Sequence, residues 1–174
     1  MFSLIAAESA IFTIFVVAYI FYIGRSLSGP TPEQVLHVPI FNTICLLSSS
    51  LTIHLALSAL RVGKGATFKF WWFLTFALGA VFLIGTGREW YQLIYEEGLT
   101  ISTNLFGTTY YSLVGLHAFH VTAGLLGLSV VMILALVGRV RQEHAQHVDV
   151  LSLYWHFVDV VWVVVFTVVY IIGR

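Results

Sequence analysis

Five long stretches of apolar residues alternate with short polar segments along the chain. They cover residues 2–23, 41–60, 70–95, 106–137 and 150–172, and the segments between them hold all of the proline and most of the charge. About 20 apolar residues in a helix, at about 1.5 Å each, cross the hydrocarbon core of a bilayer. We therefore predict an all-α polytopic membrane protein, with five transmembrane helices in one bundle and a single membrane domain over residues 1–174.

The composition agrees with this class of protein. The 174 residues are 59% hydrophobic and 9% charged with zero formal net charge, whereas a soluble domain carries about 25% charged residues. This balance excludes an ordinary soluble domain and indicates no nucleic-acid partner. The first stretch lacks a basic region and a cleavage site, so we expect a retained membrane helix and no signal peptide.

The basic residues predict the orientation in the membrane. Cytoplasmic loops carry an excess of lysine and arginine, and the loops after the second and fourth stretches are the more basic ones. We therefore expect a cytoplasmic N-terminus and a periplasmic C-terminus. The basic residues on the cytoplasmic side are then Arg61, Lys64, Lys69, Arg139 and Arg141, against Arg25 and Arg174 opposite, with Arg88 near the end of the third stretch.

Two ionisable residues lie inside the last apolar stretch. His156 and Asp159 are three residues apart, so they share one helix face. An ionisable group at that depth costs about 2.5 kcal/mol or more unless it faces protein. We expect both side chains to point at a polar partner on another helix or another subunit, or at each other.

Glu8 is the ionisable residue of the first stretch. It fits a proton-relay carboxylate or a contact for a lipid head group or a buried histidine. A structural glutamate, or one close to the membrane surface, fits equally.

His117 and His120 share a face of the fourth stretch with Gly124 and Gly127. Small residues at this spacing let a neighbouring helix approach closely, so a packing seam with hydrogen-bonded histidines is one interpretation. A haem between two histidines is another; its ligands would come from His54, from His117 or His120, and from His156.

Arg88 and Glu89 end the third stretch beside two aromatic residues. Aromatic side chains gather at the head-group level, so we expect an interfacial anchor there. Adjacent residues diverge by about 100° on a helix, and the two charges are not predicted to pair.

Several motifs together resemble one family, subunit III of the haem–copper oxidases. The run from Tyr154 to Trp162, YWHFVDVVW, resembles the family's last-helix signature, and the run from Gly115 to Val121 resembles its Gly-x-His-x-x-His-Val motif. Further matches in the same order extend the resemblance over essentially the whole chain. They are Ala7-Glu8-Ser9 (with serine after the glutamate instead of before it), Pro30 to Glu33, Asn42-Thr43, and Glu89 with Thr100 to Ser102.

The resemblance implies a non-catalytic subunit of a proton-pumping terminal oxidase in the bacterial cytoplasmic membrane. It is closest to the five-helix bacterial form, because the two helices that precede these five in the seven-helix form have no counterpart in this sequence. Haem and copper would belong to the partner catalytic subunit I, and this chain would bind none of them. It would contact that subunit, other oxidase subunits and phospholipid, stabilise the catalytic subunit and support proton uptake. Glu8 would be the family's intramembrane glutamate, with His120 as its expected partner.

Two other functions stay open at this point. One is a haem b-binding membrane anchor of a respiratory complex, which would use the histidines named above. The other is a free-standing proton or ion carrier. The choice between cytochrome c and quinol as electron donor lies on other subunits of an oxidase, so these motifs favour neither.

Overall fold

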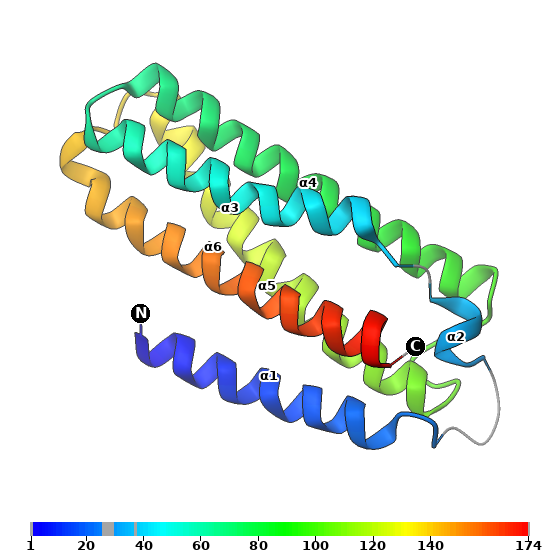
Figure 1. The fold of residues 1–174 in the computed structure, drawn as a ribbon. Coiled ribbons are helices and arrows are strands. Elements are labelled where there is room, and N and C mark those ends of the chain that lie inside the picture. The colour runs from blue at the N-terminus through cyan, green and yellow to red at the C-terminus, as the bar shows by residue number, and fades with distance from the viewer. Residues whose placement is uncertain (1, 26–29, 37, 174) are drawn as a thin grey trace. The chain divides into compact units, whose positions relative to one another are not determined.

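Every regular element of the described chain is a helix. The computed structural model describes residues 2–25, 30–36 and 38–173, and within these ranges no strand is present. The elements are α1 (Phe2–Tyr22), α2 (Pro32–Val35), α3 (Ile40–Arg61), α4 (Gly65–Tyr95), α5 (Leu105–Leu136), the 3-10 helix η1 (Gln142–His144), α6 (Ala145–Phe166) and the π-helix η2 (Thr167–Ile172) (Figure 1).

Five of the helical segments are long and apolar enough to cross a membrane. The predicted all-α class with five transmembrane helices is therefore confirmed. Two helices begin before the apolar stretches that predicted them: α4 begins at Gly65, ahead of residue 70, and α6 at Ala145, ahead of residue 150. Apolarity marks the part of a helix at hydrocarbon depth, whereas backbone hydrogen bonding continues into the polar ends. The last turns of the fifth segment, Thr167–Ile172, are wound as a π-helix, which no pattern in the sequence indicated.

Glycine ends the helices that precede the two basic loops. Gly63 follows α3 with φ of 72° and Gly138 follows α5 with φ of 73°, a conformation that residues with a side chain rarely adopt. The amide of Lys64 then donates to the carbonyl of Ala59 at 2.9 Å, and the amide of Gly63 to that of Leu60 at 3.0 Å. This pair of bonds satisfies carbonyls that the helix end leaves open.

The chain divides into two compact units, each described by itself. The first comprises Met1–Pro39, Gly85–Phe119 and Val160–Arg174, and the second comprises Ile40–Ile84 and His120–Asp159. Helices α4, α5 and α6 contribute residues to both, whereas α1 and α2 belong to the first unit and α3 to the second. The single membrane domain stays a prediction.

Glycines let helices α4, α5 and α6 pack closely in the second unit. A Cβ atom at Gly124 would lie 2.7 Å from the ring of Trp155, and one at Gly79 would lie 2.8 Å from the same ring. A Cβ at Gly127 would lie 2.9 Å from Leu151. Trp155 is fully buried as a result. The prediction that Gly124 and Gly127 admit a neighbouring helix is confirmed.

Candidate functional site

The histidine and aspartate of the last apolar stretch meet one serine of α3. The Ser50 hydroxyl donates a hydrogen bond to Asp159 Oδ2, and Ser50 Oγ lies 3.0 Å from His156 Nδ1. Asp159 is 3% exposed and His156 is partly exposed. The polar partner expected for these two residues is therefore a hydroxyl on a neighbouring helix, and His156 and Asp159 are joined through it.

The serine before Ser50 holds the tryptophan of the same stretch. Trp155 Nε1 donates to Ser49 Oγ at 2.8 Å, and the Ser49 hydroxyl donates to the Leu46 carbonyl at 2.5 Å. Both side chains are fully buried, where an indole N–H left without an acceptor costs about 1–3 kcal/mol. Adjacent serines thus make two separate contacts between α3 and α6.

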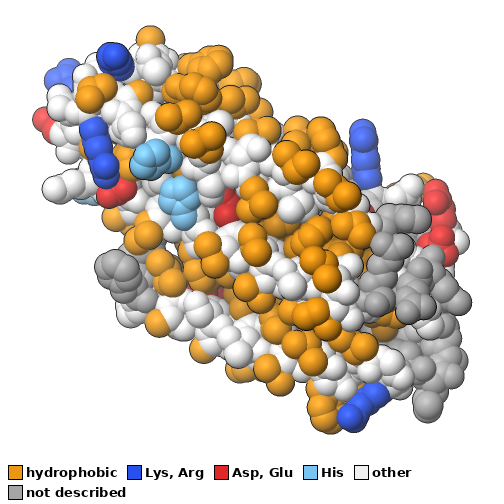
Figure 2. All heavy atoms as spheres, in the orientation of Figure 1, with side chains coloured by type: hydrophobic (Ala, Val, Ile, Leu, Met, Phe, Trp, Pro, Cys, Tyr) orange, Lys and Arg blue, Asp and Glu red, His pale blue; other side chains and the backbone are white. Residues whose placement is uncertain are grey.

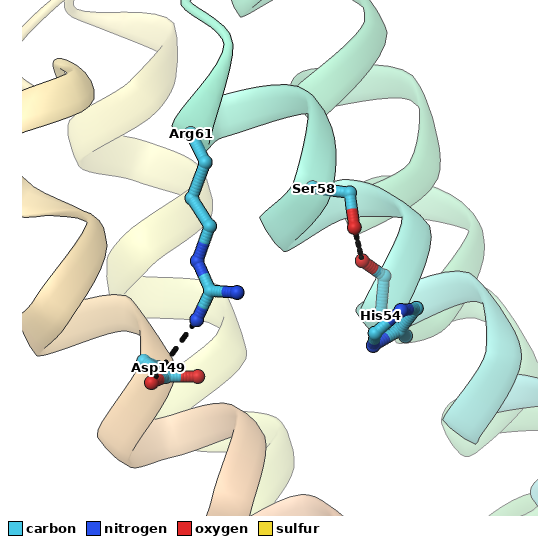
Figure 3. A network of polar contacts seen from close by, with 4 residues as sticks. All are labelled: His54, Ser58, Arg61 and Asp149. Carbon is cyan, nitrogen blue, oxygen red and sulfur yellow. Dashed lines mark hydrogen bonds and ion pairs between the residues drawn. The ribbon is translucent and has the colours of Figure 1, made fainter.

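The same two helices are linked by an ion pair nearer their ends. Arg61 Nη2 lies 3.2 Å from Asp149 Oδ2, with both side chains about half exposed, and Figure 3 shows the guanidinium reaching across to that carboxylate. Gln142 Nε2 also donates to the Arg61 carbonyl at 2.6 Å. An exposed pair of this kind contributes only about 0–1 kcal/mol to stability, so it adds little to the contact between α3 and α6.

His54 lies on α3 between the ion pair and Ser50. It is exposed, its carbonyl accepts a hydrogen bond from Ser58 at 2.9 Å (Figure 3), and it interacts electrostatically with His156. Figure 2 shows histidine side chains on one face among hydrophobic ones. We call this set the α3–α6 seam: Ser49, Ser50, His54 and Arg61 of α3 with Asp149, Trp155, His156 and Asp159 of α6.

The seam runs from a helix end into the depth of the membrane. His54 is seven positions before Arg61, which is about 10 Å along the helix axis, and Ser50 lies about 16 Å from Arg61. The hydrocarbon core is about 30 Å thick. With a hydrocarbon core centred on α3, His54 would lie within the hydrocarbon, and Ser50 with Asp159 would lie close to its midplane.

A second polar cluster lies in the first unit around Glu89. Its Oε1 accepts hydrogen bonds from the Tyr170 hydroxyl at 2.7 Å and from the Tyr110 hydroxyl at 3.2 Å. Tyr110 and Tyr170 are buried, whereas Arg88 beside Glu89 is exposed. Glu89 therefore joins α4 to α5 and to the π-helix, a role beyond that of an interfacial anchor, while the neighbouring Arg88 turns outward.

The two histidines of α5 are both buried. His117 is 1% exposed, and its ring stacks on Trp162 with 5.0 Å between centroids and 29° between planes. His120 is 6% exposed, and its carbonyl accepts the Tyr154 hydroxyl at 3.1 Å. Glu8 is partly buried on α1 of the first unit, and His120 belongs to the second unit. The pairing of Glu8 with His120 stays a prediction.

Sequence reasoning missed the hydroxyl partners of these sites. Ser49 and Ser50 come from a run of three serines within an otherwise apolar helix, and such a run is a signal for hydrogen bonds between helices. Tyr110 and Tyr170 carried no comparable signal, because tyrosine is common near membrane surfaces. Among the described residues, no group of three or more histidine, cysteine or acidic side chains is arranged to hold a metal ion.

The fold and these sites define a multi-pass helical membrane protein with polar contacts between its helices. The family model for cytochrome c oxidase subunit III matches residues 6–174. Cytochrome c oxidase subunit 3 of Synechocystis sp. is 41% identical over 97% of this chain and 72% of its own length. The subunit of the same name from Bacillus sp. is 35% identical over 97% of this chain and 82% of its own. Subunit 3 of the cytochrome bo(3) ubiquinol oxidase of Pseudomonas aeruginosa is 37% identical, covering 89% and 75%. The chain belongs to the cytochrome c oxidase subunit III family.

Proposed function

We propose that the chain is the non-catalytic subunit III of a proton-pumping haem–copper oxidase in the bacterial cytoplasmic membrane, docked on catalytic subunit I through the α3–α6 seam. Its relatives are oxidase subunits by name. Its role is to stabilise the catalytic subunit and to bind phospholipid. Glu8 supports proton uptake near the cytoplasmic surface. The contacts of His156 with Ser50 and of His117 with Trp162 favour this function over that of a haem-binding anchor.

The exposure of His54 carries this proposal. An imidazole about 10 Å inside a membrane-spanning helix is unfavourable against lipid, so a protein surface has to cover it. His156 is partly exposed beside it. Because the family is one of oxidase subunits, the partner that fits this face is the oxidase's own catalytic subunit.

Lipid suits the remaining surface. Large apolar side chains are exposed on helices other than α3 and α6, including Ile14 of α1 at 67% and Ile133 of α5 at 61%. Acyl chains cover such side chains without a hydrogen-bonding requirement. The proposed orientation places the Arg61 end of the seam on the cytoplasmic side, where a pumping oxidase takes up protons.

A bulky substitution in the α3–α6 seam tests whether this surface docks on the catalytic subunit. His54→Trp and the control Ile133→Trp both add a large ring at an exposed position of a helix. With an affinity tag on the catalytic subunit, we expect about a tenfold loss of this chain from the purified oxidase for His54→Trp, which corresponds to about 1.4 kcal/mol. Ile133→Trp leaves the ratio unchanged.

The amount of each variant in the membrane is measured with a second tag on this chain, so that a folding defect is not counted as lost docking. Full recovery of the His54→Trp variant with the catalytic subunit would contradict docking through the α3–α6 seam.

A further inference from the structure

We propose that His156, Ser50 and Asp159 form a proton relay, through which the buried Asp159 carboxyl exchanges its proton at the imidazole edge of His156. The substrate of this site is the proton itself. The inference rests on the proposed function, because the relay lies on the face that docks on the catalytic subunit. The Asp159 carboxyl would store a proton there, near the membrane midplane.

The hydrogen bonds of the three residues have one continuous order. A serine hydroxyl has a single hydrogen, and that of Ser50 is donated to Asp159 Oδ2. His156 Nδ1, 3.0 Å from Ser50 Oγ, must then be the donor of the second bond. The direction of donation therefore runs from His156 through Ser50 to Asp159.

A proton can move along this order without leaving a charge behind. When His156 gains a proton at Nε2, its Nδ1–H bond breaks as a new O–H bond forms on Ser50 Oγ. The original Ser50 O–H bond breaks at the same time, and the released proton forms a new O–H bond on Asp159 Oδ2. Imidazolium and carboxylate thereby become neutral imidazole and carboxylic acid, and Ser50 again has one hydrogen, now between itself and His156. The reverse transfers, from Asp159 Oδ2 to Ser50 Oγ and from Ser50 Oγ to His156 Nδ1, restore the starting arrangement as His156 releases its proton at Nε2.

The two ends of the relay differ in access. His156 is partly exposed, with His54 of α3 and Asp149 of α6 as the ionisable groups that act on it. Asp159 is 3% exposed, and its Oδ1 is buried without a hydrogen-bond partner among the described residues. The described residues thus provide an exit for the proton at His156, on the face that the catalytic subunit would cover, and none beyond Asp159. This arrangement suits a store that loads and unloads by the same route.

Proton exchange at the Asp159 carboxyl tests the relay. The intact oxidase, with aspartate isotopically labelled, is transferred into D2O, and the carbonyl stretch of the protonated Asp159 side chain is followed by time-resolved infrared difference spectroscopy. Asp159→Asn assigns the band. We expect Ser50→Ala to slow the exchange by about 10²-fold or more, the size of effect that a positioned proton carrier has. Ser50→Thr keeps the hydroxyl and restores the rate.

Ser58→Ala is the matched control, because Ser58 lies on the same helix and its hydroxyl bonds only to the His54 carbonyl of that helix in the described structure. An unchanged exchange rate in Ser50→Ala, or an Asp159 carboxyl that is never protonated across the stable pH range, overturns the relay. The exchange rate is independent of the recovery ratio that tests docking, so the two proposals fail separately. A purely structural contact predicts lower stability for Ser50→Ala with no change in exchange.

Discussion

A methyl group added at Gly124 should loosen the second unit, because it has no room beside Trp155. The Cβ atom of Gly124→Ala would meet two carbon atoms of the Trp155 ring at 2.7 Å, where ordinary contacts are 3.4–4 Å. The ring cannot move away easily, since it also packs against Gly79 and its Nε1 is held by Ser49 at 2.8 Å. Overpacking of this kind costs about 1–3 kcal/mol.

Helix propensity works in the opposite direction. Alanine is favoured over glycine within a helix by about 1 kcal/mol, so the net loss expected for Gly124→Ala is at most about 2 kcal/mol. For a chain of this size, each kcal/mol shifts Tm by about 2–4 °C. The matched control is Gly87→Ala on α4, where a Cβ meets nothing within 4 Å. Its Tm should stay the same or rise.

The difference in Tm between the two variants is measured in detergent. Each sample is heated, and the loss of its monodisperse size-exclusion peak reports unfolding. Trp155→Phe in the Gly124→Ala background provides a second check, because a smaller ring relieves the clash. The double variant should then be less destabilised than the sum of the two single variants, with a coupling of about 0.5–3 kcal/mol. Equal Tm values for Gly124→Ala and Gly87→Ala would refute the packing argument.

Three further substitutions probe the polar side chains. Tyr170→Phe should destabilise the first unit by about 0.5–1.5 kcal/mol, as expected for one hydrogen bond. The loss should be larger than for Tyr110→Phe, because the Tyr170 hydroxyl lies 2.7 Å from Glu89 and the Tyr110 hydroxyl 3.2 Å. Equal losses in Tm would show that bond length does not rank these contacts. Glu8→Gln should leave assembly of the oxidase nearly intact and lower sustained turnover modestly, measured as oxygen consumption over repeated turnovers, whereas failed assembly would make Glu8 a structural residue.

The class of protein was predictable from the amino-acid sequence. An apolar stretch of about 20 residues has the length of a helix that crosses a bilayer, so five helices could be predicted from the pattern of apolar residues alone. The spacing of His117, His120, Gly124 and Gly127 also indicated a helix contact, because residues three or four apart share a face whatever the fold. Helix ends were less well predicted, since Gly65 and Ala145 begin helices in polar surroundings.

Which polar groups contact one another depends on how the helices pack. His156 and Asp159 required a partner by the cost of their burial, yet nothing in their own stretch identified Ser50, more than a hundred positions earlier in the chain. The same holds for Glu89, whose partners Tyr110 and Tyr170 come from two other helices. Periodicity specifies the face that a residue occupies on its own helix, whereas the rotation and depth of the neighbouring helix depend on packing. In this protein that packing includes Trp155 seated against glycines of two other helices.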